Sequence, residues 1–92
     1  MKLYTDNEFK LMPELLELIN FEHENQIKKW GVQTHTLFEW CNYTTEELGE
    51  VAKAISENEY RDGDIDEIIK ESIQVATLSL KIAEMCIKTK LP

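Results

Sequence analysis

From residue 14 to residue 91 the sequence contains no proline, and its glycines stand singly at positions 31, 49 and 63. Because proline and glycine are the residues that most often interrupt helices, this spacing favours a few long helices over a set of short strands. Apolar residues recur at intervals of three and four in three successive stretches, as they do along one side of a helix. The sequence therefore predicts an all-α fold with three main helices.

The first predicted helix covers residues 13–30. Pro13 fits the first turn of a helix, where a missing N–H group has little consequence, and Gly31 fits the position just after its end. Residues 1–12 carry no pattern that decides their structure. The length of 92 residues is that of one domain, so we expect a single domain over residues 1–92.

The second predicted helix is capped by Thr34 or Thr36 and runs to about residue 56. A polar turn follows it, and a third helix is capped by Asp64 or Asp66 and runs to about residue 88. Each of these two helices carries apolar side chains on two of its faces. A monomer of this size cannot cover all of them, so we expect a homodimer or homotetramer that completes a four-helix-bundle-like core.

The charge of the chain limits its partners. Acidic residues outnumber basic ones by 18 to 10, which gives a formal net charge of −8. A chain with this charge is repelled by the nucleic-acid backbone and by anionic membranes, so neither is an expected partner. The sequence has no apolar run of membrane-spanning length and no apolar leader, and Cys41 and Cys86 form no closely spaced pair. We therefore expect a cytoplasmic protein.

Two short acidic segments carry the strongest functional signal: EELGE from residue 46 and ESIQ from residue 71. The first places Glu47 and Glu50 three residues apart, and the second does the same with Glu71 and Gln74. Side chains at this spacing share one side of a helix. If the two helices pack antiparallel, four oxygen-bearing side chains converge on one point.

The ordinary explanation of such glutamates is a solvated helix face. Against it, Glu47 and Glu50 share their side of the helix with Trp40 and Tyr43, and no lysine or arginine lies there to pair with them. Carboxylates in apolar surroundings are unfavourable unless they are paired or bound to metal. Oxygen ligands without a thiolate, and without histidine at Glu-x-x-His spacing, favour Mg²⁺ or Mn²⁺ over zinc or a di-iron centre.

The two acidic segments, 20 residues apart, resemble the signature of the MazG-like nucleoside triphosphate pyrophosphohydrolases, an all-α superfamily. That signature is Glu-Glu-x-x-Glu followed by Glu-x-x-Asp. The segment QIKKWGVQTH from residue 26, followed by Trp40, is similar to the corresponding segment of small, phage-type members. The resemblance covers roughly residues 22–85.

The resemblance implies Mg²⁺-dependent hydrolysis of a nucleoside triphosphate to a monophosphate and pyrophosphate, an activity suited to clearing the nucleotide pool. Matched by position, Glu47, Glu50 and Glu71 hold the metal, and Gln74 stands where the family has an aspartate. An amide oxygen coordinates Mg²⁺ but brings no charge and cannot act as a base. Either Glu47 or Glu50 orients or deprotonates the attacking water.

Six further residues are candidates for contact with the substrate: Lys29, Trp30, Gln33, His35, Lys53 and Lys81. Each has an ordinary alternative as a solvated lysine, a packed tryptophan or a polar loop residue. Gln74 keeps a second functional hypothesis open, a non-catalytic all-α oligomeric module that binds nucleotide or a partner protein. The base and sugar of the nucleotide and the phosphorus attacked are left open by the sequence.

Overall fold

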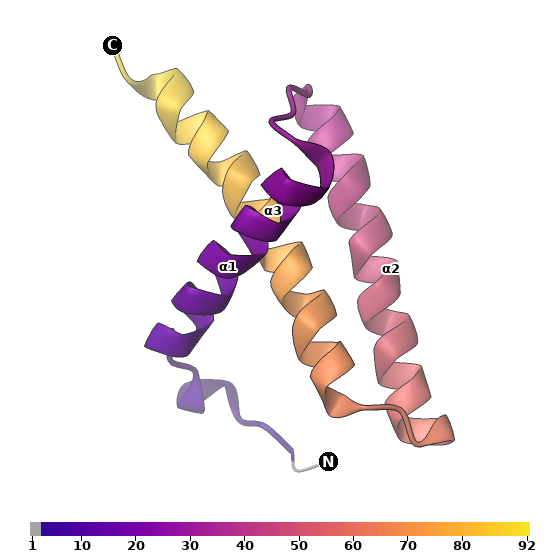
Figure 1. Ribbon diagram of the computed structural model, residues 1–92. Coiled ribbons are helices and arrows are strands. Elements are labelled where there is room, and N and C mark those ends of the chain that lie inside the picture. Colours follow the sequence, from indigo (N-terminus) through magenta and orange to yellow (C-terminus); the bar gives the residue numbers. More distant parts are fainter. Residues whose placement is uncertain (1–2) are drawn as a thin grey trace.

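The computed structural model describes residues 3–92, which form three long α-helices and one short 3-10 helix, with no strand among them. The short helix η1 spans Asp6–Glu8, and helices α1, α2 and α3 span Pro13–Trp30, Leu37–Arg61 and Ile65–Lys90. Helix α3 is the central element: α2 lies antiparallel beside it, and α1 crosses it (Figure 1). The predicted all-α class with three main helices is confirmed.

The boundaries of α1 and the start of α2 follow their predicted signals. Helix α1 begins at Pro13, and its C-terminal Gly31 has a φ of 73°, a conformation that favours glycine, with its N–H donating to the Ile27 carbonyl at 2.8 Å. Of the two candidate caps for α2, the structure uses Thr36. The Thr36 hydroxyl accepts a hydrogen bond from the Glu39 backbone at 3.2 Å, and the Glu39 carboxylate accepts one from the Thr36 backbone at 2.9 Å.

Helix α2 is longer than predicted, and the expected end near residue 56 is wrong. Its last turn is stabilised by an ion pair from Arg61 to Glu57, with an N–O distance of 3.6 Å. The Asn58 side chain then donates to the Gly63 carbonyl at 2.8 Å and closes the turn. The polar composition of residues 57–61 indicated a turn. Polar residues that pair one helical turn apart, as Glu57 and Arg61 do, are equally compatible with a helix.

The turn between α2 and α3 requires glycine for a steric reason. A Cβ atom at Gly63 would lie 2.9 Å from the backbone carbon of Glu57, closer than such atoms approach. Of the two candidate caps for α3, the structure uses the next residue, Asp64, whose side chain accepts a hydrogen bond from the Asp66 backbone at 2.9 Å. Helix α3 extends two residues past its predicted end, to Lys90.

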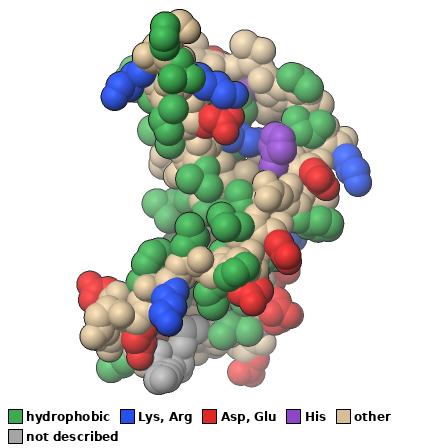
Figure 2. Space-filling view, turned by 90° about the vertical axis from the view of Figure 1, so that its left-hand side faces the viewer, with side chains coloured by type: hydrophobic (Ala, Val, Ile, Leu, Met, Phe, Trp, Pro, Cys, Tyr) green, Lys and Arg blue, Asp and Glu red, His purple; other side chains and the backbone are tan. Residues whose placement is uncertain are grey.

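The core of the described chain is small. Its buried apolar residues are Trp40 and Leu78, and its buried polar residues are Gln26 and Thr77. Many large apolar side chains are exposed on all three long helices, and Figure 2 shows hydrophobic side chains spread over the visible face. Of the two apolar faces predicted on α2 and on α3, only one on each helix is covered within the chain.

No helix of residues 3–92 combines sufficient length with sufficient apolar character to cross a bilayer.

Candidate functional site

Three of the four predicted metal ligands meet between α2 and α3. The side-chain amide of Gln74 on α3 has one terminal atom 2.7 Å from Oε2 of Glu47 on α2 and 3.0 Å from Oε2 of Glu71 on α3. Because both carboxylate oxygens are acceptors, the amide is assigned with its NH₂ group between them, where it donates to both. The two glutamates are thus brought together across the helix pair, as their sequence spacing predicts.

The environment of Glu47 disfavours its negative charge. The side chain is half-buried, and burial raises the pKa of its carboxyl above the ordinary value. The negative charges of Glu71 and Glu50, with smaller effects of Glu22 and Glu46, raise this pKa further. A cation or a proton bound to Glu47 would therefore reduce both the cost of burying its charge and the repulsion from the neighbouring glutamates.

Glu50 departs from the prediction that it shares a buried face with Glu47. It is exposed and lines a second, smaller cavity of about 210 Å³ together with Glu71 and Lys53. Residues three positions apart point about 60° away from each other around a helix. This difference is enough to place Glu47 against α3 and Glu50 toward solvent.

The residues present fit a hard cation only in part. Among residues 3–92, no three carboxylate, imidazole or thiol groups are grouped as ligands around one point. Glu47 and Glu71 offer carboxylate oxygens, and Gln74 can offer its carbonyl oxygen if its amide turns by half a rotation. This oxygen-only set matches the preference of Mg²⁺, which keeps several of its waters.

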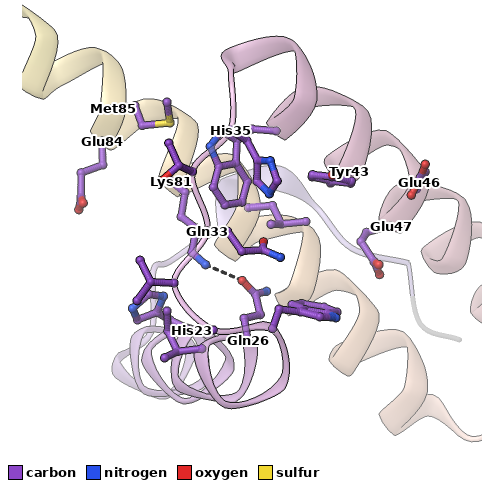
Figure 3. A pocket seen from close by; sticks show the side chains of 17 residues that line it. His23, Gln26, Gln33, His35, Tyr43, Glu46, Glu47, Lys81, Glu84 and Met85 are labelled. Atoms are coloured by element: carbon purple, nitrogen blue, oxygen red, sulfur yellow. Dashed lines mark hydrogen bonds between the residues drawn. The ribbon is translucent and has the colours of Figure 1, made fainter.

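A larger cavity of about 580 Å³ adjoins this group, with Glu46 and Glu47 in its lining (Figure 3). It is bordered by α1, by the connection from residue 31 to residue 36, by α2 and by α3. Its volume lies within the range of about 300–1,000 Å³ that is typical of small-molecule sites.

The structure places the six candidate substrate contacts in three different surroundings. Four line the larger cavity, whereas Lys53 lines the smaller one, and the ammonium of Lys29 lies over the ring of Trp30 at 4.8 Å. Trp30 is itself half exposed, so its alternative role as a core residue is wrong. The four residues in the larger cavity are Trp30, Gln33, His35 and Lys81.

An aromatic cluster forms one wall of the larger cavity. The ring of His35 packs edge-on against Trp40 and Tyr43, with centroid distances of 4.9 Å and 5.0 Å. The Nε2 atom of His35 is buried and has no hydrogen-bond partner among the described residues, and its Nδ1 lies 3.8 Å from Glu39. The cavity thus has an aromatic wall, and His35 in that wall keeps one buried nitrogen without a partner.

Lys81 belongs to a half-buried hydrogen-bond network, so the alternative that it is a solvated surface lysine is wrong. Its Nζ donates to Gln26 Oε1 at 2.6 Å (Figure 3). Gln26 in turn donates to Glu22 at 2.8 Å. The ammonium also lies 5.7 Å from the centre of the Trp40 ring. Burial lowers the pKa of Lys81, while the nearby charge of Glu22 acts in the opposite direction.

Sequence reasoning missed the part that Glu22 and Gln26 play in this network. Their separation of four residues on α1 puts them on one side of the helix, so the pair itself could have been anticipated. The contact of Gln26 with Lys81 joins residues 55 positions apart, and helix periodicity carries no signal for it.

Comparisons with models of protein families, with curated proteins and with solved structures found no match to this chain.

Proposed function

We propose that this protein is a Mg²⁺-dependent nucleoside triphosphate pyrophosphohydrolase, which converts its substrate to a nucleoside monophosphate and pyrophosphate. The observation that carries the proposal is the meeting of Glu47, Glu71 and Gln74 between two helices, directly beside a cavity of nucleotide-compatible size. The resemblance of the two acidic segments to the MazG-like enzymes supports it.

The cavity accommodates the nucleoside. Its aromatic wall, formed by His35, Trp40 and Tyr43, supplies surfaces on which a planar base stacks. The Gln33 amide and the remaining donors of Lys81 are available to the polar edges of the base and to the sugar. The phosphates then extend toward the end of the cavity that Glu46 and Glu47 line.

A cation is needed between the polyphosphate and the carboxylates of Glu47 and Glu71, because both carry negative charge. Glu47, Glu71 and the carbonyl oxygen of Gln74 would hold Mg²⁺, and the bound cation would supply positive charge to offset that of the phosphates. Glu50 lies outside the hydrogen-bonded trio and is exposed, so we assign to it the orientation of the attacking water and the acceptance of its proton.

One observation favours a second candidate function, a non-catalytic module that binds nucleotide. The Gln74 amide already satisfies both carboxylates, and its carbonyl oxygen carries no charge, so metal binding is weaker here than at a site of four carboxylates. Such a protein would bind nucleotide in the same cavity without releasing pyrophosphate.

A pyrophosphate-release assay distinguishes the two, with a panel of common and modified nucleoside triphosphates and with Mg²⁺ present or absent. We expect release only with Mg²⁺, and its loss in Glu71→Gln with no loss of helical circular dichroism. Glu24→Gln on the exposed part of α1 is the matched control and keeps its activity. Nucleotide binding by calorimetry without any release would support the binding module and contradict the enzyme.

A further inference from the structure

Two contacts between α2 and α3 follow one another along the helix pair. At the first, the Gln74 amide lies 2.7 Å from Glu47. At the second, the ammonium of Lys81 lies 5.7 Å from the centre of the Trp40 ring. On each helix the two contacts are separated by two turns on the same side, or about 10.5 Å along the axis. This separation is comparable to the length of a nucleoside.

The larger cavity extends between these two contacts, because Glu47, Trp40 and Lys81 all line it. With the phosphates at the Glu47 end, as in the proposed function, the base of the nucleotide extends to the level of Lys81. The part of a base that lies farthest from its sugar carries the substituent at C4 of a pyrimidine or at C6 of a purine. This substituent is a carbonyl oxygen in uracil and guanine and an amino group in cytosine and adenine.

The ammonium of Lys81 has two hydrogen-bond donors that no group of residues 3–92 uses. One of its three N–H groups donates to Gln26 Oε1 at 2.6 Å, and the side chain lines the cavity (Figure 3). An ammonium group has donors and no acceptor. Lys81 can therefore bind a carbonyl oxygen of a base in the cavity, but it cannot pair with an amino group.

Gln26 does not supply the missing acceptor. Its Oε1 accepts from Lys81, and its Nε2 donates to the Glu22 carboxylate at 2.8 Å. If the amide turned over, its NH₂ group would face the ammonium and its oxygen would face the carboxylate, and both contacts would be repulsive. Gln26 is also only 6% exposed, so it has little room to move. Glu22 thus fixes the Gln26 amide, which in turn fixes Lys81.

The surroundings of Lys81 influence its charge and leave the selection to it. Burial lowers the pKa of Lys81, and the negative charge of Glu22 opposes this change and so favours the ammonium form. Glu84, another carboxylate of the lining, is 70% exposed and pairs with Lys88 at 3.2 Å. The Gln33 amide makes no hydrogen bond within residues 3–92, so it can turn either end to a base and does not discriminate.

We propose that Lys81, held in place by Gln26 and Glu22, selects nucleotides whose base carries a carbonyl oxygen at C4 of a pyrimidine or C6 of a purine. Nucleotides with an amino group at that position are bound less well. The inference rests on the proposed function, which places the phosphates at Glu47. A hydrogen bond to a charged group is stronger than one between neutral groups, and its loss corresponds to about a tenfold to hundredfold change in affinity.

The affinities of nucleoside monophosphates in the presence of Mg²⁺ test the selection without any turnover. UMP and CMP form one matched pair and IMP and AMP a second, since within each pair a carbonyl oxygen takes the place of an amino group. By isothermal titration calorimetry we expect UMP and IMP to bind about tenfold to a hundredfold more tightly than their partners. Equal affinities within the pairs, tighter binding of CMP and AMP, or no binding of any monophosphate would overturn the proposal.

The substitution Lys81→Gln tests the residue itself. An amide presents a donor or an acceptor equally well, so we expect the difference within each pair to disappear while the helical circular dichroism is unchanged. Lys70→Gln is the matched control, because Lys70 is an exposed lysine of the same helix outside both cavities. A preference that persists in a folded Lys81→Gln variant would contradict the proposal, and the comparison in the natural protein decides it if the variant does not fold.

The selection and the proposed function fail in different measurements. Tighter binding of UMP than of CMP without pyrophosphate release from any triphosphate would support the selection and contradict the enzyme. Pyrophosphate release together with equal binding of UMP and CMP would contradict the selection and leave the enzyme in place.

Discussion

The side-chain amide of Gln74 donates a hydrogen bond to Glu47 across 2.7 Å and so links the acidic segments of α2 and α3. The same NH₂ group donates to Glu71 at 3.0 Å, which places a neutral donor between two carboxylates. An aspartate at this position would be a third negative charge in the same space. The glutamine therefore stabilises the metal-free chain and lowers its demand for a cation.

The substitution Gln74→Asp tests this relationship. Without metal it replaces two hydrogen bonds by repulsion, and we expect it to destabilise the protein by about 1–3 kcal/mol. With Mg²⁺ we expect tighter binding and recovery of the lost stability, both measured by thermal melts over a Mg²⁺ titration. Asn20→Asp adds the same charge on the exposed surface of α1 and serves as control. An unchanged or weaker Mg²⁺ dependence would show that Gln74 is not a ligand.

The raised pKa of Glu47 predicts how the stability of the metal-free protein depends on pH. Its carboxyl is protonated more readily in the folded chain than in the unfolded one, mainly because of burial and secondly because of Glu71. Stability therefore falls as the pH rises from the ordinary carboxyl pKa through the raised value. We expect Glu47→Gln to raise the melting temperature at neutral pH and to have little effect below the ordinary carboxyl pKa. Equal effects at both pH values would contradict this explanation.

The Lys81 network predicts a coupling between α1 and α3. Lys81→Met leaves the buried Oε1 of Gln26 without its donor and is expected to cost about 1–3 kcal/mol of stability. Adding Gln26→Leu removes the unpaired group, so the double variant is expected to lose less than the sum of the single losses. A double-mutant cycle by urea denaturation measures this, with a coupling of about 0.5–3 kcal/mol expected. Additive losses would mean that the two side chains act independently.

Two aromatic residues in the first turn of α2 provide a test of the core. Trp40 is 8% exposed, whereas Phe38, two positions earlier, is 82% exposed. Trp40→Ala is expected to destabilise the protein by about 3–5 kcal/mol, and Phe38→Ala by no more than about 0.5 kcal/mol. Chemical denaturation of both variants at one protein concentration makes the comparison. Losses of similar size would show that α2 packs differently.

Local signals in the sequence predicted the starts of the helices well. Pro13, Thr36 and Asp64 act within one turn of their own position, where sequence and structure are directly related. The end of α2 was misjudged because polar residues such as Glu57 and Arg61 are typical of turns as well as of solvated helix ends. The spacing of four residues between Glu57 and Arg61, which allows an ion pair within a helix, was the signal for a helix end.

The site was predictable to the extent that it depends on helix periodicity. The spacing within each acidic segment indicated that Glu47 and Glu71 could meet. In the structure both side chains contact the side-chain amide of Gln74. The exposure of Glu50 and the half-buried place of Lys81 depend on the rotation of α2 and α1 against α3. Packing of the whole molecule sets that rotation, and no short segment of sequence specifies it.

The proposed activity is tested most directly by identifying the phosphorus-containing products formed from a nucleoside triphosphate with Mg²⁺. Phosphorus nuclear magnetic resonance of the reaction mixture resolves the possible products. We expect the natural protein to form monophosphate and pyrophosphate in equal amounts, and Glu71→Gln to form neither. The appearance of diphosphate and inorganic phosphate, or of no product from any nucleotide in the panel, would contradict it.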